Sequence, residues 1–255
     1  MSISLAKLKQ LRQLAQNKFR EQHQLFIAEG SKTISDLCRF GYKLVELYAI
    51  EENGMLEKAQ SISSSVVSID SKEMERISQL QTPPGILGIF HLPEISSTDQ
   101  PDTLEWSLIL DGIRDPGNMG TLLRAAHWFG CMHIYLCNSC VNIFNPKVVQ
   151  ASMGSLAALQ IKNISSTTAF LHHAIEKGHT LYATDMKGEP LSTEKKLKPG
   201  IIILGSESHG ISSVWEHSAI QTLSIPSFGN TSPESLNVAV AAGIIMFHAR
   251  ISEGL

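Results

Sequence analysis

A chain of 255 residues with 43% hydrophobic content can bury a full core, so we expect one large or two modest domains. The formal net charge of -3 argues against a uniformly basic nucleic-acid coat, although a local basic patch can still bind phosphates. The 4 cysteines are too few for a disulfide framework, which favours a reducing compartment, and the chain has no long apolar run, so we expect a cytoplasmic protein without a membrane partner.

The first 20 residues contain basic side chains and no acidic one. The candidates for RNA binding here are Lys7, Lys9, Arg12, Lys18 and Arg20. Such a segment either binds phosphate groups or forms a solvated helix face, and composition leaves both interpretations open. Leucines at threefold spacing predict a helix over residues 4–16, and an organellar transit peptide is the alternative.

Residues 1–95 are predicted to form a small α/β domain. Helical patterns cover 4–16 and 31–40, and short strand patterns cover 44–50, 65–69 and 86–91. The segment that follows is rich in Pro, Ser, Thr and acidic residues, and it shows no helical or alternating apolar pattern. We therefore expect a linker over 96–105.

Residues 106–255 alternate apolar strands with helices. Strands are predicted at 107–110, 133–137, 180–184, 201–204 and 223–226, and helices at 119–130, 167–177, 211–218 and 233–251. This order predicts a mainly parallel sheet covered by helices on both faces. Ligands bind at the carboxyl ends of strands in such sheets, so unusual loops at these ends are candidate sites.

The first unusual loop is "DGIRDPGNMGTLLRAAHWFG", residues 111–130. A turn at "DPG" lets Asn118 cap a helix whose buried stripe contains Leu122, Ala126 and Phe129. Arg124 lies on the opposite face of that helix, where it can meet a ligand or solvent.

The second loop, "ILGSESHGIS", places Glu207 between Gly205 and Gly210. The glycines allow a sharp turn or a close approach to a ligand, and a plain structural turn is the alternative. The third, "LSIPSFGNTSPESLNVAVAAGIIMF", matches a helix capped by Ser232, with Ser235 and Asn237 in its first turn. The apolar helix that follows either contacts a second subunit or is buried in a monomer.

No metal site is expected. Cys137 and Cys140 form a CxxC pair, but no second pair of similar spacing completes four zinc ligands, and the 10 histidines are scattered.

The ordered set "DPGNMGTLLRAA", "ILGSESHG" and "IPSFG…ESLNVAVAA" resembles the three signature motifs of the SpoU/TrmH class of SPOUT RNA methyltransferases. The stretches "KFREQHQLFIAEGSKTISDL" and "TPPGILGIF" resemble the substrate-binding domain that often precedes the catalytic domain in this family. The likeness therefore extends over nearly the whole chain. Within the third motif, the segment from Ser227 to Glu234 is longer than the family pattern, so its contacts do not follow from the resemblance.

The resemblance implies transfer of a methyl group from S-adenosylmethionine to a ribose 2′-hydroxyl of RNA, by a homodimer with a C-terminal trefoil knot. It implies catalytic or RNA-orienting roles for Asn118, Arg124, Glu207, Ser235 and Asn237. It implies cofactor contacts for Gly205, Glu207, Ile225, Pro226, Gly229 and Leu236. We expect ribosomal RNA as the substrate; transfer RNA, or a non-catalytic RNA-binding protein with a similar domain, are the alternatives.

Overall fold

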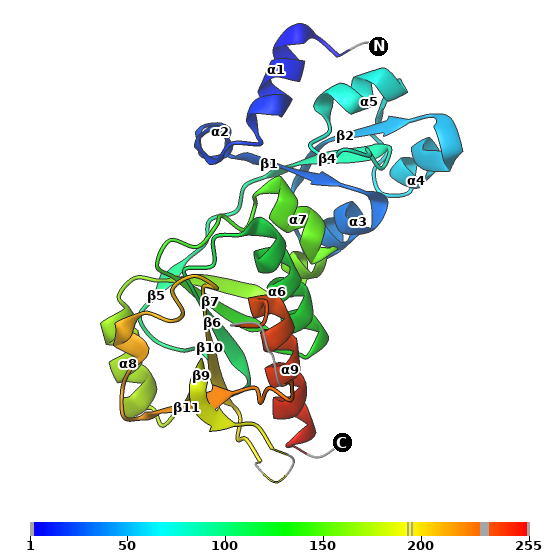
Figure 1. Ribbon diagram of the computed structural model, residues 1–255. Coiled ribbons are helices and arrows are strands. Elements are labelled where there is room, and N and C mark those ends of the chain that lie inside the picture. The colour runs from blue at the N-terminus through cyan, green and yellow to red at the C-terminus, as the bar shows by residue number, and fades with distance from the viewer. Residues whose placement is uncertain (1–2, 193, 195, 230–234, 254–255) are drawn as a thin grey trace. The chain divides into compact units, whose positions relative to one another are not determined.

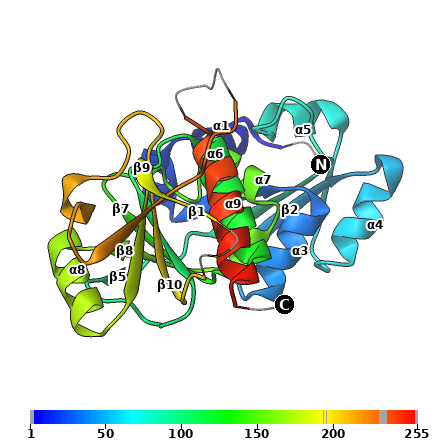
Figure 2. The same ribbon diagram turned by 60° about the horizontal axis from the view of Figure 1, so that its bottom comes forward.

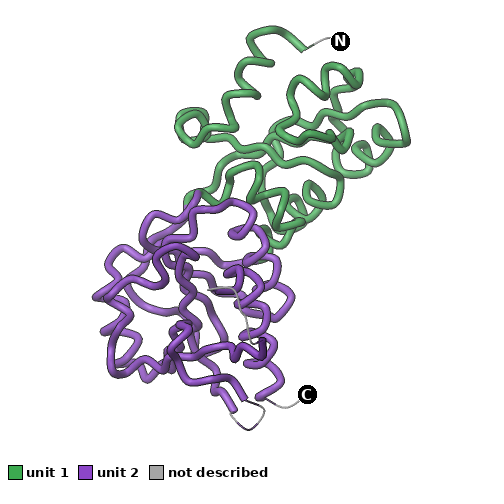
Figure 3. Tube along the Cα trace, viewed as in Figure 1, with its two compact units in different colours: residues 1–94, 142–158 green, residues 95–141, 159–255 purple. Residues whose placement is uncertain are grey.

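The computed structural model describes residues 3–192, 194, 196–229 and 235–253. The chain divides into two compact units, coloured separately in Figure 3. Unit 1 contains residues 1–94 and 142–158, and unit 2 contains residues 95–141 and 159–255. The mixed α/β class and the mainly parallel second sheet agree with the sequence prediction.

Unit 1 is built on a four-stranded sheet in the order β1-β4-β2-β3. Its strands are β1 (Leu25–Glu29), β2 (Leu44–Ile50), β3 (Val67–Ile69) and β4 (Ile86–His91). Strand β4 runs antiparallel to β1 and β2, whereas β2 and β3 are parallel. The helices are α1 (Leu5–Gln13), α2 (Asn17–His23), α3 (Ser31–Arg39), α4 (Met55–Gln60), α5 (Ser71–Ile77) and α7 (Pro146–Ser152).

The leucine repeat at the start of the chain belongs to the core of unit 1. Leu8, Leu11 and Leu14 are buried together with Ile27 and Ile89 of the sheet, whereas Leu5 is 77% exposed. The repeat therefore forms the first helix of a domain, as its spacing predicted.

The segment 142–158 groups with unit 1 although it lies within the predicted C-terminal domain. The Phe144 ring lies 4.7 Å from the Phe26 ring, and Asn142 Oδ1 accepts a hydrogen bond of 3.2 Å from Arg20 Nη2. Sequence order alone could not predict this excursion, because the contacts join residues more than a hundred positions apart.

Unit 2 contains a seven-stranded sheet in the order β11-β9-β10-β6-β7-β8-β5, whose paired strands are all parallel (Figure 1). The strands are β5 (Ser97–Thr98), β6 (Ser107–Asp111), β7 (His133–Cys137), β8 (Gln160–Ile164), β9 (Thr180–Pro190), β10 (Gly200–Gly205) and β11 (Ile220–Ser224). The helices are α6 (Pro116–Trp128), α8 (Thr167–Glu176) and α9 (Val238–Ile251).

Helices cover both faces of this sheet (Figure 2). Phe170 and Leu171 of α8 are buried with Ile109 and Ile203 of the central strands on one face. On the other face α9 packs against α6 and β10. Residues 211–218, predicted as a helix, form only a short 3-10 turn at Ser213–Trp215.

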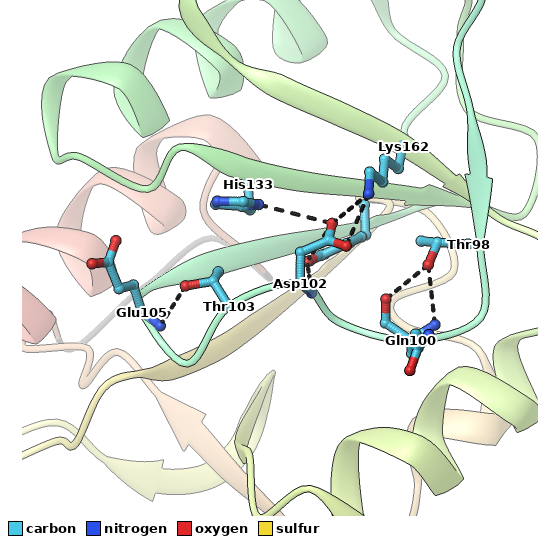
Figure 4. A network of polar contacts seen from close by, with 8 residues as sticks. Thr98, Gln100, Asp102, Thr103, Glu105, His133 and Lys162 are labelled. Atoms are coloured by element: carbon cyan, nitrogen blue, oxygen red, sulfur yellow. Dashed lines mark hydrogen bonds and ion pairs between the residues drawn. The ribbon is translucent and has the colours of Figure 1, made fainter.

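Residues 96–105 differ from the free linker that their composition predicted. Ser97 and Thr98 pair with β8, so this segment supplies the edge strand of the sheet. Asp102 then forms an ion pair of 2.8 Å with Lys162 (Figure 4). Its backbone N–H also donates to the Tyr135 hydroxyl at 2.8 Å. These polar contacts hold a segment in which Pro101 is buried and Leu104 is exposed.

Candidate active site

The carboxyl ends of β10, β6 and β7 lie side by side at one edge of the sheet. The register aligns Asp111 with Gly205 on one side and with Cys137 on the other. The loops that follow these strands line a cavity of about 400 Å³, which also borders Val238 at the start of α9. The parallel sheet thus places the first two sequence motifs around one cavity, as the rule for such sheets predicts, and the third motif reaches it through Val238.

The loop after β10 is closed on itself. Ser206 N donates to Gly210 O at 3.0 Å, and Gly210 N donates to Ser206 O at 2.8 Å. Gly205 precedes this closure so tightly that a Cβ atom there would lie 2.1 Å from the carbonyl carbon of Gly210. Gly210 itself has a φ of +66°. The glycines thus make the sharp turn that the sequence analysis allowed, and the space next to Gly205 is filled by the backbone of the loop itself.

Asn118, Glu207 and Asn237 form one hydrogen-bonded cluster. Glu207 Oε1 accepts from Asn118 Nδ2 at 3.1 Å, from Asn237 Nδ2 at 2.7 Å and from the Val238 backbone N–H at 3.2 Å. Asn237 Nδ2 also donates to Asn118 Oδ1 at 2.8 Å. These contacts join three segments that are far apart in the sequence, and within the described part of the chain Glu207 Oε2 has no hydrogen-bond partner.

The helix starts in this cluster differ from our expectation. Asp115, not Asn118, caps α6: its Oδ1 accepts from the Asn118 backbone N–H at 2.7 Å, with Pro116 in the first helical position. The Asn118 side chain is therefore available to the cluster. Helix α9 begins at Val238 rather than at residue 233, and its cap is Asn237, whose Oδ1 accepts from the backbone N–H groups of Ala239 and Val240. The predicted cap Ser232 lies outside the described residues.

A buried carboxylate forms the floor of the cavity, and the sequence analysis missed it. Asp111 is 3% exposed. Its Oδ1 accepts from Asn138 Nδ2 and its Oδ2 from Ser212 N, each at 2.6 Å. Asn138 has a φ of 51°, an unusual conformation for a residue other than glycine. A polar residue at the end of an apolar strand was the only available signal.

Arg124 is not brought into the cluster within this chain. It is exposed on α6, six residues after Asn118, which places the two side chains about 120° apart around the helix. It lies opposite the buried Leu122 and Ala126, as predicted, while Phe129 is only half-buried at the end of the helix. The arginine that lines the cavity is Arg114, which the sequence analysis did not single out.

The remaining predicted contacts lie near the same edge but outside the cavity lining. Ile225 and Pro226 follow β11 and are half-buried, whereas Gly229 and Ser235 are exposed. Leu236 is 43% exposed and immediately precedes the Asn237 cap. None of these residues is among those lining the cavity described above.

The basic residues near the start of the chain are not equivalent. Arg20 is 1% exposed, and its guanidinium donates to Leu14 O, Ala15 O and Asn17 Oδ1 at 3.0 to 3.1 Å. Burial lowers the pKa of Arg20. The prediction that Arg20 binds RNA is therefore wrong, because its donors already hold the backbone after α1.

The other cations of this segment lie at the surface of unit 1. Lys7 forms an ion pair of 2.6 Å with Glu46, and Arg12 Nε donates to Arg76 O at 2.8 Å. Lys9 and Lys18 are exposed and have no ion pair within the described residues. Lys9 and Lys18 are consequently the most available phosphate-binding candidates.

The cysteines and histidines do not gather into a metal centre among the described residues. All 4 cysteines are free, and burial raises the pKa of the Cys137 and Cys140 thiols. Raised thiol pKa values oppose the thiolate form that binds metals.

Comparison with known proteins identifies families that match each part of the chain. Residues 105–247 match the SpoU rRNA Methylase family, and residues 6–88 match the MRM3-like substrate binding domain. The 23S rRNA (guanosine(2553)-2′-O)-methyltransferase RlmP of Bacillus subtilis is 25% identical over 96% of this chain and 96% of its own length.

Solved structures give the same result. An RNA methyltransferase of the TrmH family from Porphyromonas gingivalis is 35% identical, with a TM-score of 0.83 and 98% coverage of both chains. An AdoMet-bound rRNA methyltransferase from Sinorhizobium meliloti is 29% identical, with a TM-score of 0.80 and coverage of 98% of this chain and 97% of that one. With these motifs at the ends of β6 and β10 and a family match over most of unit 2, the chain belongs to the SpoU rRNA methylase family.

Proposed function

We propose that this chain methylates a ribose 2′-hydroxyl of ribosomal RNA with S-adenosylmethionine as the methyl donor. The observation that carries the proposal is the Asn118, Glu207 and Asn237 cluster at the rim of the cavity. A non-catalytic RNA-binding protein would have no need to hold a carboxylate with three donors at a strand end. The intact cluster therefore favours an enzyme.

The region around Gly205 fits the cofactor. Gly205 allows the sharp turn after β10, because a Cβ there would collide with the Gly210 backbone, and this turn places Glu207 in the lining of the cavity. Together with Glu207, the residues that would hold S-adenosylmethionine are Gly205, Ile225, Pro226, Gly229 and Leu236. When bound, this cofactor supplies an activated methyl group on a sulfonium centre. The AdoMet-bound Sinorhizobium structure supports the identity of the cofactor.

The protein must align the ribose hydroxyl and take up its proton. Glu207 is the candidate proton acceptor, because its Oε1 is held by three donors while Oε2 remains for the hydroxyl. Asn118 and Asn237 act as positioning residues for that carboxylate. We assign Arg124 and Ser235 to orienting the RNA, with the planar guanidinium of Arg124 on a phosphate.

Ribosomal RNA is favoured over transfer RNA. The RlmP relative, matched over nearly its whole length, is named for the 2′-O-methylation of 23S rRNA. Residues 6–88 resemble a substrate-binding domain that a large, folded RNA could engage. Transfer RNA remains the second candidate substrate, because a tRNA-methylating structure matches 58% of this chain with a TM-score of 0.51.

A homodimer is proposed from one face of α9. Val240, Ile244, Phe247 and Ile251 are 52%, 39%, 54% and 38% exposed, and their spacing of three and four residues places them on a single stripe. An exposed apolar stripe on an ordered helix is typical of a subunit interface. Light scattering should give a dimer mass for the wild type and a monomer mass for Val240→Asp with Phe247→Asp. A wild-type monomer across dilution would contradict the proposal.

Two further proposals concern the topology of the C-terminal domain and the cell compartment of the protein. We propose a C-terminal trefoil knot built from the second and third motifs, supported by the hydrogen bond from Asn237 Nδ2 to Glu207 Oε1 that joins these two motifs. The 4 free cysteines are consistent with the cytoplasm. In the described part of the chain, no helix has the length and apolar character needed to span a bilayer.

The function is tested by transfer of labelled methyl groups to ribosomal RNA from a strain that lacks this protein. We expect one nucleotide of that RNA to gain a 2′-O-methyl group, and transfer RNA from the same strain to gain none. Methylation on a base, or no transfer by folded protein that binds the cofactor, would refute the proposed reaction.

A further inference from the structure

A second cavity lies in unit 1, between α1 and α2, far along the chain from the cluster described above. Its volume is about 510 Å³. The two helices contribute lysine, glutamine and aromatic side chains to it, chiefly Lys9, Gln10, Gln13, Phe19, Gln22 and His23. We call it the α1–α2 groove.

Two rings line the α1–α2 groove from consecutive turns of α2. The Phe19 and His23 ring centroids lie 6.4 Å apart, and their planes differ by only 17°. Both side chains are half-buried, so each ring is supported by the protein and still accessible. Lys18 places its Nζ 5.4 Å from the centre of the Phe19 ring. Supported, nearly parallel rings beside a cation form a surface on which a flat heterocycle can stack.

The groove also lacks any carboxylate among its lining residues. Helix α1 contains no acidic residue, and within the described residues its only ion pair joins Lys7 to Glu46. Lys9 and Lys18 therefore remain for an anionic ligand. The side chains of Gln10, Gln13 and Gln22 have no hydrogen-bond partner among the described residues, so their donors and acceptors are free.

We propose that the α1–α2 groove binds an unpaired nucleotide of the RNA substrate, which rests on the proposed function of this chain. The base stacks on the Phe19 and His23 rings, a glutamine amide reads its polar edge, and Lys9 or Lys18 contacts a neighbouring phosphate. A paired base is covered on both faces by its neighbours and cannot offer a free face to these rings. The groove therefore selects single-stranded over double-stranded RNA. An acidic peptide would use the lysines but would gain nothing from the ring pair.

The test measures binding of RNA oligonucleotides to the full-length protein without cofactor. A fluorescent single strand of about ten nucleotides, near the size of known single-strand sites, is compared with the duplex of the same sequence. The variants are Phe19→Leu, which removes the ring, and Phe19→Tyr, which keeps it. Phe40→Leu is the matched control, because Phe40 is 48% exposed on unit 1 and, like Phe19, lies beside a cation, here Arg39, but it is outside the groove.

We expect Phe19→Leu to weaken single-strand binding about tenfold, while Phe19→Tyr and Phe40→Leu bind like the wild type. The duplex should bind more weakly than the single strand and respond little to Phe19→Leu. Equal binding of single strand and duplex, or wild-type affinity in Phe19→Leu, would overturn the proposal. A linear polyphosphate of matched charge is the second comparison. If it binds as tightly as the RNA and loses the same affinity in Phe19→Leu, the groove binds polyanions in general and the proposal is overturned.

Thermal melting decides whether Phe19→Leu is folded. If Phe19→Leu is unfolded, the proposal is tested with a single strand that contains the fluorescent base 2-aminopurine, bound to the wild type and to His23→Leu. Stacking on the rings quenches the fluorophore, so we expect quenching in the wild type and less in His23→Leu. A bound base that is not quenched in the wild type would refute the stacking. Methyl transfer takes place in unit 2 and requires cofactor. If the protein transfers methyl groups but RNA binding does not depend on the Phe19 ring, only the nucleotide-binding role of the groove is refuted. If RNA binding depends on the ring but no methyl group is transferred, only the proposed reaction is refuted.

Discussion

Glu207→Gln separates proton transfer from support of the loop after β10. Glu207 Oε1 accepts hydrogen bonds of 3.1, 2.7 and 3.2 Å from Asn118, Asn237 and Val238. Glutamine has the same shape and keeps one side-chain oxygen, so all three donors retain an acceptor. The substitution removes the negative charge and the ability to take up a proton.

The two roles predict different magnitudes. Hydrogen bonds to a charged group contribute more than neutral ones, and for three bonds at an exposed loop the loss is about 1 to 2 kcal/mol. For a chain of this size, each kcal/mol lowers Tm by about 2 to 4 °C. Loss of a general base instead lowers kcat by about 10²- to 10⁴-fold. We therefore expect a large loss of transfer with a shift in Tm of only a few degrees.

The assay is labelled methyl transfer at saturating cofactor, with calorimetric binding of S-adenosylhomocysteine and thermal melting of the same samples. Glu216→Gln is the control, because Glu216 is an exposed acid of unit 2 that does not line the cavity. Transfer at the wild-type rate would show that Glu207 is not the proton acceptor. Parallel losses of cofactor binding, Tm and transfer would show that the carboxylate acts only through the loop.

Three further substitutions test separate parts of the chain. Arg124→Lys keeps the charge but loses the planar fork, so transfer should fall about tenfold or more with unchanged cofactor affinity and Tm; normal transfer would exclude Arg124 from the reaction. Gly205→Ala places a Cβ 2.1 Å from the Gly210 carbonyl carbon, so the loop after β10 must shift, and calorimetry should show lost cofactor binding. Retained affinity would show that cofactor binding does not depend on the tight turn at Gly205. Burial raises the pKa of Glu29, so the folded state holds this proton more tightly than the unfolded state does. The free energy of unfolding of the wild type, measured by urea titration, should therefore fall as the pH rises above about 4.5 toward the raised pKa, and that of Glu29→Gln should fall less. Equal dependence on pH in the two proteins would refute this.

Continuous apolar runs predicted the central strands of unit 2 well. The runs at 107–110, 133–137 and 201–204 correspond to β6, β7 and β10, which are buried on both faces and therefore contain little polar sequence. Strand β8 has the sequence "QIKNI" and is only partly buried. It was missed because an edge-side strand can carry polar residues without the continuous apolar run.

Local signals failed where tertiary contacts decide the structure. The Ser-Pro pair at 232–233 is a good helix start, yet α9 begins at Val238, because Asn237 is held by Glu207 and caps the helix from there. Arg20 looked like a surface cation in the sequence. Its burial depends on carbonyl groups after α1 and on Asn142, which no local pattern reveals.

The composite site was predictable in part, because parallel strands present their carboxyl ends at one edge. That rule predicted that the loops of Asn118 and Glu207 would meet, and the structure joins their side chains directly. It did not predict the role of Asp111, which depends on strand register. Only the alignment of Asp111 with Gly205 and Cys137 shows that its carboxylate can reach the loops on both sides.

That register explains how an exposed loop can hold a carboxylate in a fixed place. The loop after β10 is fastened at its start by the paired backbone bonds of Ser206 and Gly210, and at its end by the bond of 2.6 Å from Ser212 N to Asp111. Glu207 lies between these two anchors, and its Oε1 is held by the start of α9. Because the loop is held through its own backbone, by backbone pairing at its start and by the Ser212 N–H on the Asp111 carboxylate at its end, the position of Glu207 depends little on burial of its own side chain. The site therefore combines a solvent-accessible carboxylate, which RNA can reach, with the fixed geometry that proton transfer requires.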